Sequence, residues 1–187
     1  MDTALALELL RKSLQDLCEV FNQNEFNPLL ESDIAAHLYH RLLMNGCPSL
    51  HLYSETRICG IDEENRKYDL AIGSVDTELA CVKPVLIAQL KCFQRWGFSH
   101  QQHRRRFEGI IVEDIESLKQ ASGVLREGRV EIVADFVHTS QTIGYLNGSW
   151  NGKKRRDVLI SLCRENALSL IWVHPNPDDK LVVERLV

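Results

Sequence analysis

The sequence lacks the local signatures of several common protein classes. It has no C-x-x-C pair, no G-x-S-x-G nucleophile motif and no glycine-rich phosphate loop. Its apolar runs fall short of the roughly 18 residues that cross a membrane, and its first residues carry acid where a secretory signal needs base. We therefore expect a cytoplasmic protein that makes no contact with a membrane.

The six cysteines are scattered and show no spacing typical of a zinc site. Isolated thiols of this kind are typical of proteins in a reducing compartment. We expect no structural zinc, and reduced, mostly packed thiols at Cys18, Cys47, Cys59, Cys81, Cys92 and Cys163.

Length and composition favour one globular domain. The chain has 187 residues, 44% of them hydrophobic, which is enough for one sizeable core and too little for two comfortable domains. We expect a single domain over residues 1–187, with an accessory helix in residues 1–26, a core in residues 27–137, and a helix with strands in residues 153–187.

The periodicity of apolar residues predicts an α/β fold with a central mixed sheet flanked by helices. The second helix has Asn27 as its expected N-cap, Pro28 in its first turn and Gly46 at its end. Pro84 is expected to open the third strand, and residues 93–106 to form a loop. The expected helices span residues 3–20, 28–45, 107–125 and 153–165, and the expected strands residues 49–54, 67–74, 84–91, 130–137, 168–174 and 181–186.

Two of the expected strands carry polar groups into apolar surroundings. Asp69 lies in the second strand, and Gln89 and Lys91 share one face near the end of the third. A buried, unpaired charge costs on the order of several kcal/mol, so these side chains need partners. A metal ion together with a substrate phosphate would supply them.

An acid on one strand and a polar-x-Lys on the next resembles the PD-(D/E)xK, or restriction-endonuclease-like, nuclease superfamily. The resemblance covers residues 27–137, in the order helix, strand, strand, strand, helix, strand. It implies a restriction-endonuclease-like core in which an acid of the opening helix, here Glu31, completes the metal site. It also implies a Mg²⁺ or Mn²⁺ ion held by Asp69, Gln89 and Glu31, with Lys91 orienting the attacking water.

The chain departs from the family pattern at two positions. Tyr68 stands in place of the name-giving proline, and Gln89 replaces the usual Asp or Glu. A neutral ligand at Gln89 predicts weaker metal binding, because one negative charge is missing. The alternative is a catalytically degenerate domain that binds nucleic acid or another protein.

Simpler explanations remain open for the individual residues. Asp69 and Lys91 could form a plain buried ion pair with Gln89 hydrogen-bonded beside them. Glu31 could be a first-turn acid that the helix dipole favours without any further function.

Basic residues gather in clusters although the formal net charge is −4. Nucleic-acid contact leaves a basic footprint on a domain, so the clusters matter if the fold brings them to one side. Otherwise they are ordinary solvated faces. We expect DNA, or less readily RNA, as partner, with a homodimer or a partner subunit possible. The candidate contacts are Arg95, Arg104, Arg105, Arg106, Lys153, Lys154, Arg155 and Arg156.

Overall fold

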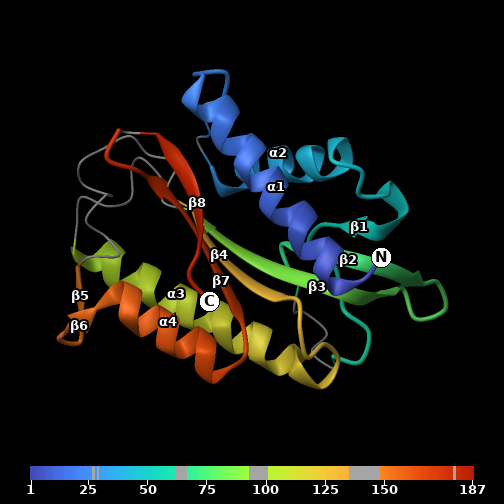
Figure 1. Ribbon diagram of the computed structural model, residues 1–187. Helices are drawn as coiled ribbons and strands as arrows, with labels where there is room; N and C mark the ends of the chain where they lie inside the picture. The colour runs from blue at the N-terminus through green and yellow to red at the C-terminus, as the bar shows by residue number, and fades with distance from the viewer. Residues whose placement is uncertain (27, 29, 62–66, 93–100, 135–147, 179) are drawn as a thin grey trace.

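A computed structural model describes residues 1–187 except residues 27, 29, 62–66, 93–100, 135–147 and 179, and it describes the backbone alone for residues 101–107. The described elements form an α/β fold with a mixed central sheet between two layers of helices (Figure 1). The expected α/β class and the mixed sheet are therefore confirmed.

The central sheet has six strands in the order β1-β2-β3-β4-β7-β8. The pairs β1–β2, β2–β3 and β7–β8 are antiparallel, whereas β3–β4 and β4–β7 are parallel. A separate two-stranded hairpin is made by β5 and β6. The strands are β1 Leu52–Tyr53, β2 Leu70–Asp76, β3 Cys81–Cys92, β4 Arg129–Ala134, β5 Ser149–Trp150, β6 Lys153–Lys154, β7 Ser169–Pro175 and β8 Leu181–Arg185.

Two helices cover each face of the sheet. Helices α1 (Thr3–Asn22) and α2 (Glu31–Met44) lie on one face, and α3 (Gln101–Gln120) and α4 (Arg155–Glu165) on the other (Figure 1). The carboxyl ends of the parallel strands β3, β4 and β7 meet at one edge, at the left of Figure 1. The amino ends of α2, α3 and α4 lie at the same edge. In open α/β sheets this carboxyl edge is where ligands bind.

The first helix shows how the apolar spacing directs packing. Leu10, Leu14 and Leu17 recur three and four residues apart and are fully buried against the sheet. The side chain of Asp2 accepts a hydrogen bond from the Leu5 N–H at 2.9 Å and so caps the helix.

Several element boundaries differ from those expected from the sequence. Helix α2 begins at Glu31 instead of Pro28, and the expected N-cap, residue 27, lies outside the described residues. Helix α3 begins at Gln101, so Arg104, Arg105 and Arg106 are helical and not part of a loop, and it ends at Gln120. The apolar pattern misplaced the start of α3 because its first turns are dominated by polar and basic residues.

The third strand is longer than expected, and Pro84 lies inside it. Strand β3 begins at Cys81, and the β2–β3 register shifts between Ile72 and Gly73, where Gly73 pairs with Pro84. A Cβ atom at Gly73 would meet the Lys83 carbonyl oxygen at 2.2 Å, so only glycine permits this close approach. The bulge allows β3 to include Pro84 and to stay paired with β2 on both sides of it.

Two of the six cysteines form a disulfide, which corrects the expectation of six free thiols. Cys59 and Cys81 are bonded across a sequence separation of 22 residues. This bond ties the segment after β1 to the start of β3. The other four, Cys18, Cys47, Cys92 and Cys163, are buried.

Among the described residues, no helix has both the length and the apolar character needed to traverse a membrane.

Candidate active site at the carboxyl edge of the sheet

Strand β3 continues past the point where its neighbour β2 begins. The last pair between them is Leu70 with Ala88, and β3 runs on to Cys92. The N–H groups of Leu90 and Cys92 face the side that β2 has left, because alternate residues of a strand point to alternate neighbours. These two groups need acceptors from elsewhere in the chain.

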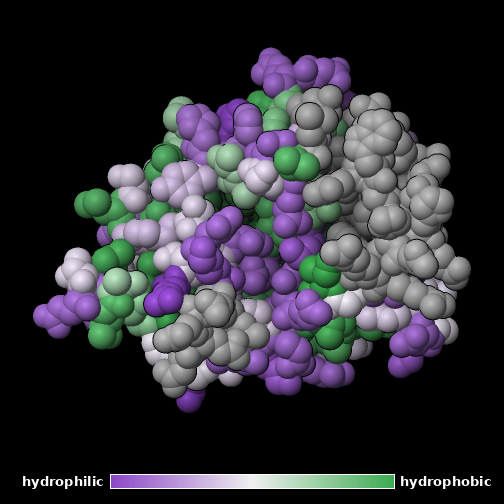
Figure 2. All heavy atoms as spheres, turned by 180° about the vertical axis from the view of Figure 1, so that it is seen from behind, coloured by the Kyte–Doolittle hydropathy of each residue, from purple (hydrophilic) through white to green (hydrophobic). Residues whose placement is uncertain are grey.

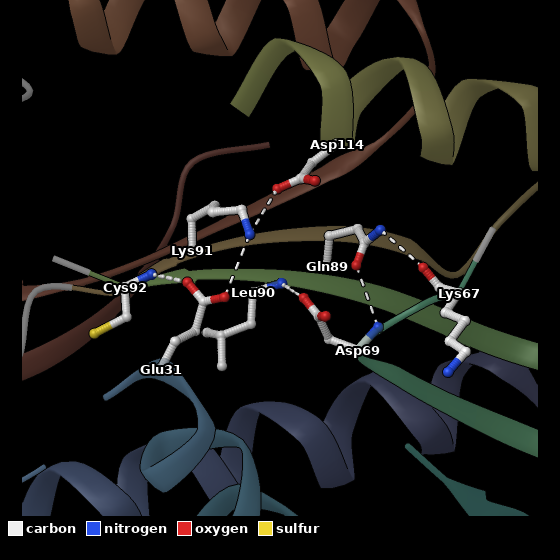
Figure 3. A network of polar contacts seen from close by, with 8 residues as sticks. All are labelled: Glu31, Lys67, Asp69, Gln89, Leu90, Lys91, Cys92 and Asp114. Carbon is white, nitrogen blue, oxygen red and sulfur yellow. Dashed lines mark hydrogen bonds and ion pairs between the residues drawn. The ribbon is translucent and has the colours of Figure 1, made fainter. Parts of the chain in front are cut away.

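Two carboxylates take the place of the missing strand. Asp69, directly before β2, accepts a hydrogen bond from the Leu90 N–H at Oδ2 (2.7 Å). Glu31, in the first turn of α2, accepts one from the Cys92 N–H at Oε2 (3.0 Å). The sheet therefore fixes both acids at its carboxyl edge, on the side of α2 (Figure 3).

Lys91 is held between two acids that come from opposite faces of the sheet. Its Nζ lies 3.3 Å from Glu31 Oε1, which belongs to α2, and 3.4 Å from Asp114 Oδ2, which belongs to α3 (Figure 3). The Lys91 side chain is only 17% exposed. Glu31 thus contacts Lys91 directly, Asp69 lies close enough to raise the pKa of Lys91, and Asp114 is a further partner that the sequence did not indicate.

Gln89 takes a different position from the other three expected residues. Its Oε1 accepts a hydrogen bond from the Asp69 N–H at 3.2 Å, and its Nε2 donates one to the Lys67 carbonyl at 3.4 Å (Figure 3). It shares the face of Ile87 and Lys91, toward α3, and does not line the pocket described next. The amide therefore braces the turn that carries Asp69.

A pocket of about 470 Å³ opens beside the two capping carboxylates. Its wall combines Glu31, Glu55 and Asp69 with small or aromatic residues of α2, among them Ala35 and Tyr39. This volume lies in the range of ligand sites, roughly 300–1,000 Å³. The resemblance did not point to Glu55, which lies in the segment after β1.

The electrostatics of the site follow from burial and from the closeness of its charges. Burial raises the pKa of Asp69, although the Leu90 N–H and the Lys91 ammonium act against that rise. Burial opposes the charge of Lys91, but Asp114, Glu31 and Asp69 outweigh it and raise its pKa. Lys91 therefore stays a cation at neutral pH.

Two further acids lie behind Lys91, and the sequence interpretation missed both. Burial raises the pKa of Asp114 to about 7. Glu131 of β4 pairs in register with Gln89 and is completely buried, and burial raises its pKa well above the ordinary range. Both Glu131 oxygens lack a hydrogen-bond partner among the described residues. The sequence signal for Glu131 was a single acid within the apolar run of residues 130–134.

The basic residues differ in how free their side chains are. Lys153 and Lys154 are exposed on β6, next to the amino end of α4. Arg155 is buried and bonds Glu108 at 2.5 Å, and Arg156 bonds Glu184 at 2.6 Å. Arg95 and the side chains of Arg104, Arg105 and Arg106 lie outside the described residues.

The oxygen donors at the pocket are of the kind that Mg²⁺ and Mn²⁺ prefer. Asp69 Oδ1 has no hydrogen-bond partner within the described part of the chain, and Glu31 lies on the same pocket. The Leu90 carbonyl points to the same strand edge as its N–H. No group of three or more His, Cys, Asp or Glu side chains that could hold a metal ion is found among the described residues. The donors suit a metal in kind, whereas the expected ligand Gln89 is occupied by backbone groups.

Comparison with family models, with curated proteins and with solved structures finds no match for this chain. The geometry of the carboxyl edge and the residues found there are therefore the basis for inferring a function.

Proposed function

We propose that the protein is a metal-dependent nuclease that hydrolyses phosphodiester bonds of DNA. The observation that carries this proposal is the convergence of Asp69, Glu31 and Lys91 at the carboxyl edge, next to a pocket. Two acids and a lysine, presented by separate elements at one strand end, are the groups that phosphodiester hydrolysis needs.

The residues divide the chemical work by position and charge. Asp69 and Glu31, with the Leu90 carbonyl, would hold Mg²⁺ or Mn²⁺, which when bound would acidify a water molecule and offset phosphate charge. Lys91 does not line the pocket, but its ammonium contacts Glu31, which does. From there it would orient the attacking water and offset the charge that develops on the phosphate.

The order of elements supports a restriction-endonuclease-like core. Helix α2, strands β1, β2 and β3, helix α3 and strand β4 follow the chain order of that family, and α2 and α3 lie on opposite faces of the sheet. The contact of 3.3 Å between Glu31 of α2 and Lys91 of β3 supports the same proposal.

One observation favours a second candidate function. Gln89, which replaces the family's second acid, makes two hydrogen bonds to backbone groups and lies outside the pocket. A domain with only two pocket acids from the expected set could bind nucleic acid or a protein without cleaving anything. The alternative is therefore a catalytically degenerate interaction module.

A cleavage assay separates the two candidates. Purified protein is incubated with single- and double-stranded DNA and with RNA, in Mg²⁺, in Mn²⁺ and in EDTA. We expect cleavage of DNA with either metal and none with EDTA, because chelation removes the activated water. Retained binding without cleavage of any substrate would favour the interaction module.

The exposed lysines of β6 provide a test of DNA contact. Replacing Lys153 and Lys154 with Ala should weaken DNA binding and lower the slope of log affinity against log salt by about 2. The reason is that each phosphate contact that is lost reduces the number of counterions released on binding. Fluorescence anisotropy over a range of salt concentrations measures both quantities.

The matched control removes two lysines from the opposite edge. Lys83 lies near the start of β3 and Lys119 near the end of α3, and both are exposed. Their replacement with Ala should leave affinity and salt slope unchanged. Equal effects of the two double variants would show that general charge, and not the carboxyl edge, governs binding.

Figure 2 shows the face opposite to that of Figure 1, with hydrophilic residues gathered at its centre.

A further inference from the structure

The ammonium group of Lys91 has two acidic partners that are not equivalent. Glu31 reaches it from α2 at 3.3 Å, and Asp114 reaches it from α3 at 3.4 Å (Figure 3). We infer that Asp114 is the positioning residue of the site, the permanent anchor that holds Lys91 at the carboxyl edge. This inference deepens the proposed nuclease function and rests on it for its effect on cleavage.

The Glu31 carboxylate is not reserved for Lys91, because it makes other contacts at the pocket. One of its oxygens accepts the Cys92 N–H at 3.0 Å, and the other contacts Lys91. Glu31 also lines the pocket and is 32% exposed on its side chain. Any ligand that draws the Glu31 carboxylate into the pocket therefore competes with Lys91 for it.

Asp114 is not exposed to such competition from the pocket. It does not line the pocket, and its side chain is only 15% exposed. Its Oδ2 is buried and makes no hydrogen bond among the described residues, and the Lys91 ammonium, 3.4 Å away, is its ion-pair partner. The apolar face of α3, with Ile111, Ile115 and Leu118 fully or almost fully buried, fixes the carboxylate over the end of β3. Asp114 can therefore hold Lys91 whether or not the pocket is filled.

A lysine at a reaction site needs such an anchor. Its side chain has four rotatable carbon–carbon bonds and loses much of its rotamer freedom when it is held in one place. Lys91 leaves the end of β3 at the point where β2 no longer packs beside it. A carboxylate on a rigid helix fixes the position of the charge, and a misplacement of about 1 Å can lower a rate a hundredfold.

The test measures the order of the Lys91 side chain directly, without metal or DNA. The ¹³C relaxation of its Cε methylene is recorded at slightly alkaline pH, where Asp114, with a pKa of about 7, is charged. The isosteric variant Asp114→Asn should lower the order parameter of this methylene to that of a flexible group, below about 0.6. The variant Glu31→Gln should leave Lys91 ordered, because Asp114 still holds it.

Two internal controls keep the result specific. Glu113→Gln removes an exposed charge from the adjacent position of α3 and should not change the order of Lys91. Lys119, an exposed lysine paired with Glu116, should remain equally mobile in all variants. In the cleavage assay, Asp114→Asn should lower kcat roughly tenfold to a hundredfold with little change in KM, since positioning affects the chemical step.

Two outcomes would overturn the inference. One is an unchanged order of Lys91 in Asp114→Asn, and the other is a loss of order in Glu31→Gln, which would make Glu31 the anchor. The second measurement decides the matter even if Asp114→Asn does not fold. Absence of cleavage by the unaltered protein would count against the proposed function alone, because the relaxation measurement does not depend on activity.

Discussion

Asp69→Asn should abolish DNA cleavage while leaving the fold intact. Asparagine keeps an oxygen that can accept the Leu90 N–H, so the edge of β3 stays capped. It loses the negative charge that the metal requires, and we expect the cleavage rate to fall by about a thousandfold or more. Initial rates in Mg²⁺ and Mn²⁺, with a circular dichroism melt of each variant, measure both parts of this prediction.

Lys91→Met should have a comparable effect on cleavage for a different reason. It removes the only lysine that contacts Glu31 and Asp114 among the described residues.

The matched control for the loss of an acid in Asp69→Asn is Asp76→Asn, at the far end of β2. Full activity in Asp69→Asn would show that Asp69 serves only as a cap for the sheet edge.

Glu131→Met should stabilise the protein. The carboxyl group of Glu131 is completely buried, and both of its oxygens lack a hydrogen-bond partner among the described residues. Burying such a group costs about 1–3 kcal/mol, and Met fills a similar volume without polar oxygens. We expect the free energy of unfolding to rise by about that amount, as measured by urea denaturation at mildly acid pH.

The gain should grow as the pH rises. Burial raises the pKa of Glu131 above its ordinary value, so the folded state keeps the proton that the unfolded state loses from about pH 4.3 upward. The unaltered protein therefore loses stability as the pH rises toward the folded-state pKa of Glu131. Glu131→Met has no carboxyl group at this position, so its free energy of unfolding does not fall for this reason. Glu127→Met, at an exposed position, is the control. Destabilisation of Glu131→Met at both acid and alkaline pH would mean that the carboxyl group has a stabilising partner.

The periodicity of apolar residues predicted the helices and strands better than their ends. The leucines of α1 recur at helical spacing, and the apolar run of β3 is buried on both faces, so both elements were predicted. The start of α3 was not, because residues 101–106 carry no apolar stripe. The bulge at Gly73 and Pro84 depends on the pairing of two strands, which one strand's sequence does not contain.

The sequence predicted the candidate site in part. Asp69 and Lys91 were found as charges in apolar strands, and Glu131 in β4 meets the same criterion. Asp114 lies three residues after Ile111 and four before Leu118, on the buried face of α3, but in the sequence it is hard to tell from the exposed acids Glu113 and Glu116 beside it. The position of Gln89 depends on backbone groups of the turn before β2, which the strand pattern does not predict.

Anomalous diffraction from crystals soaked in Mn²⁺ shows whether Asp69 and Glu31 bind a metal ion. We expect an anomalous peak in the pocket, about 2.0 to 2.6 Å from carboxylate oxygens of Asp69 and Glu31. Crystals of Asp69→Asn soaked in the same way should lack that peak. A pocket open to solvent that shows no Mn²⁺ at these two carboxylates, or Mn²⁺ bound only elsewhere on the chain, would contradict the claim that this edge of the sheet is a metal-dependent nuclease site.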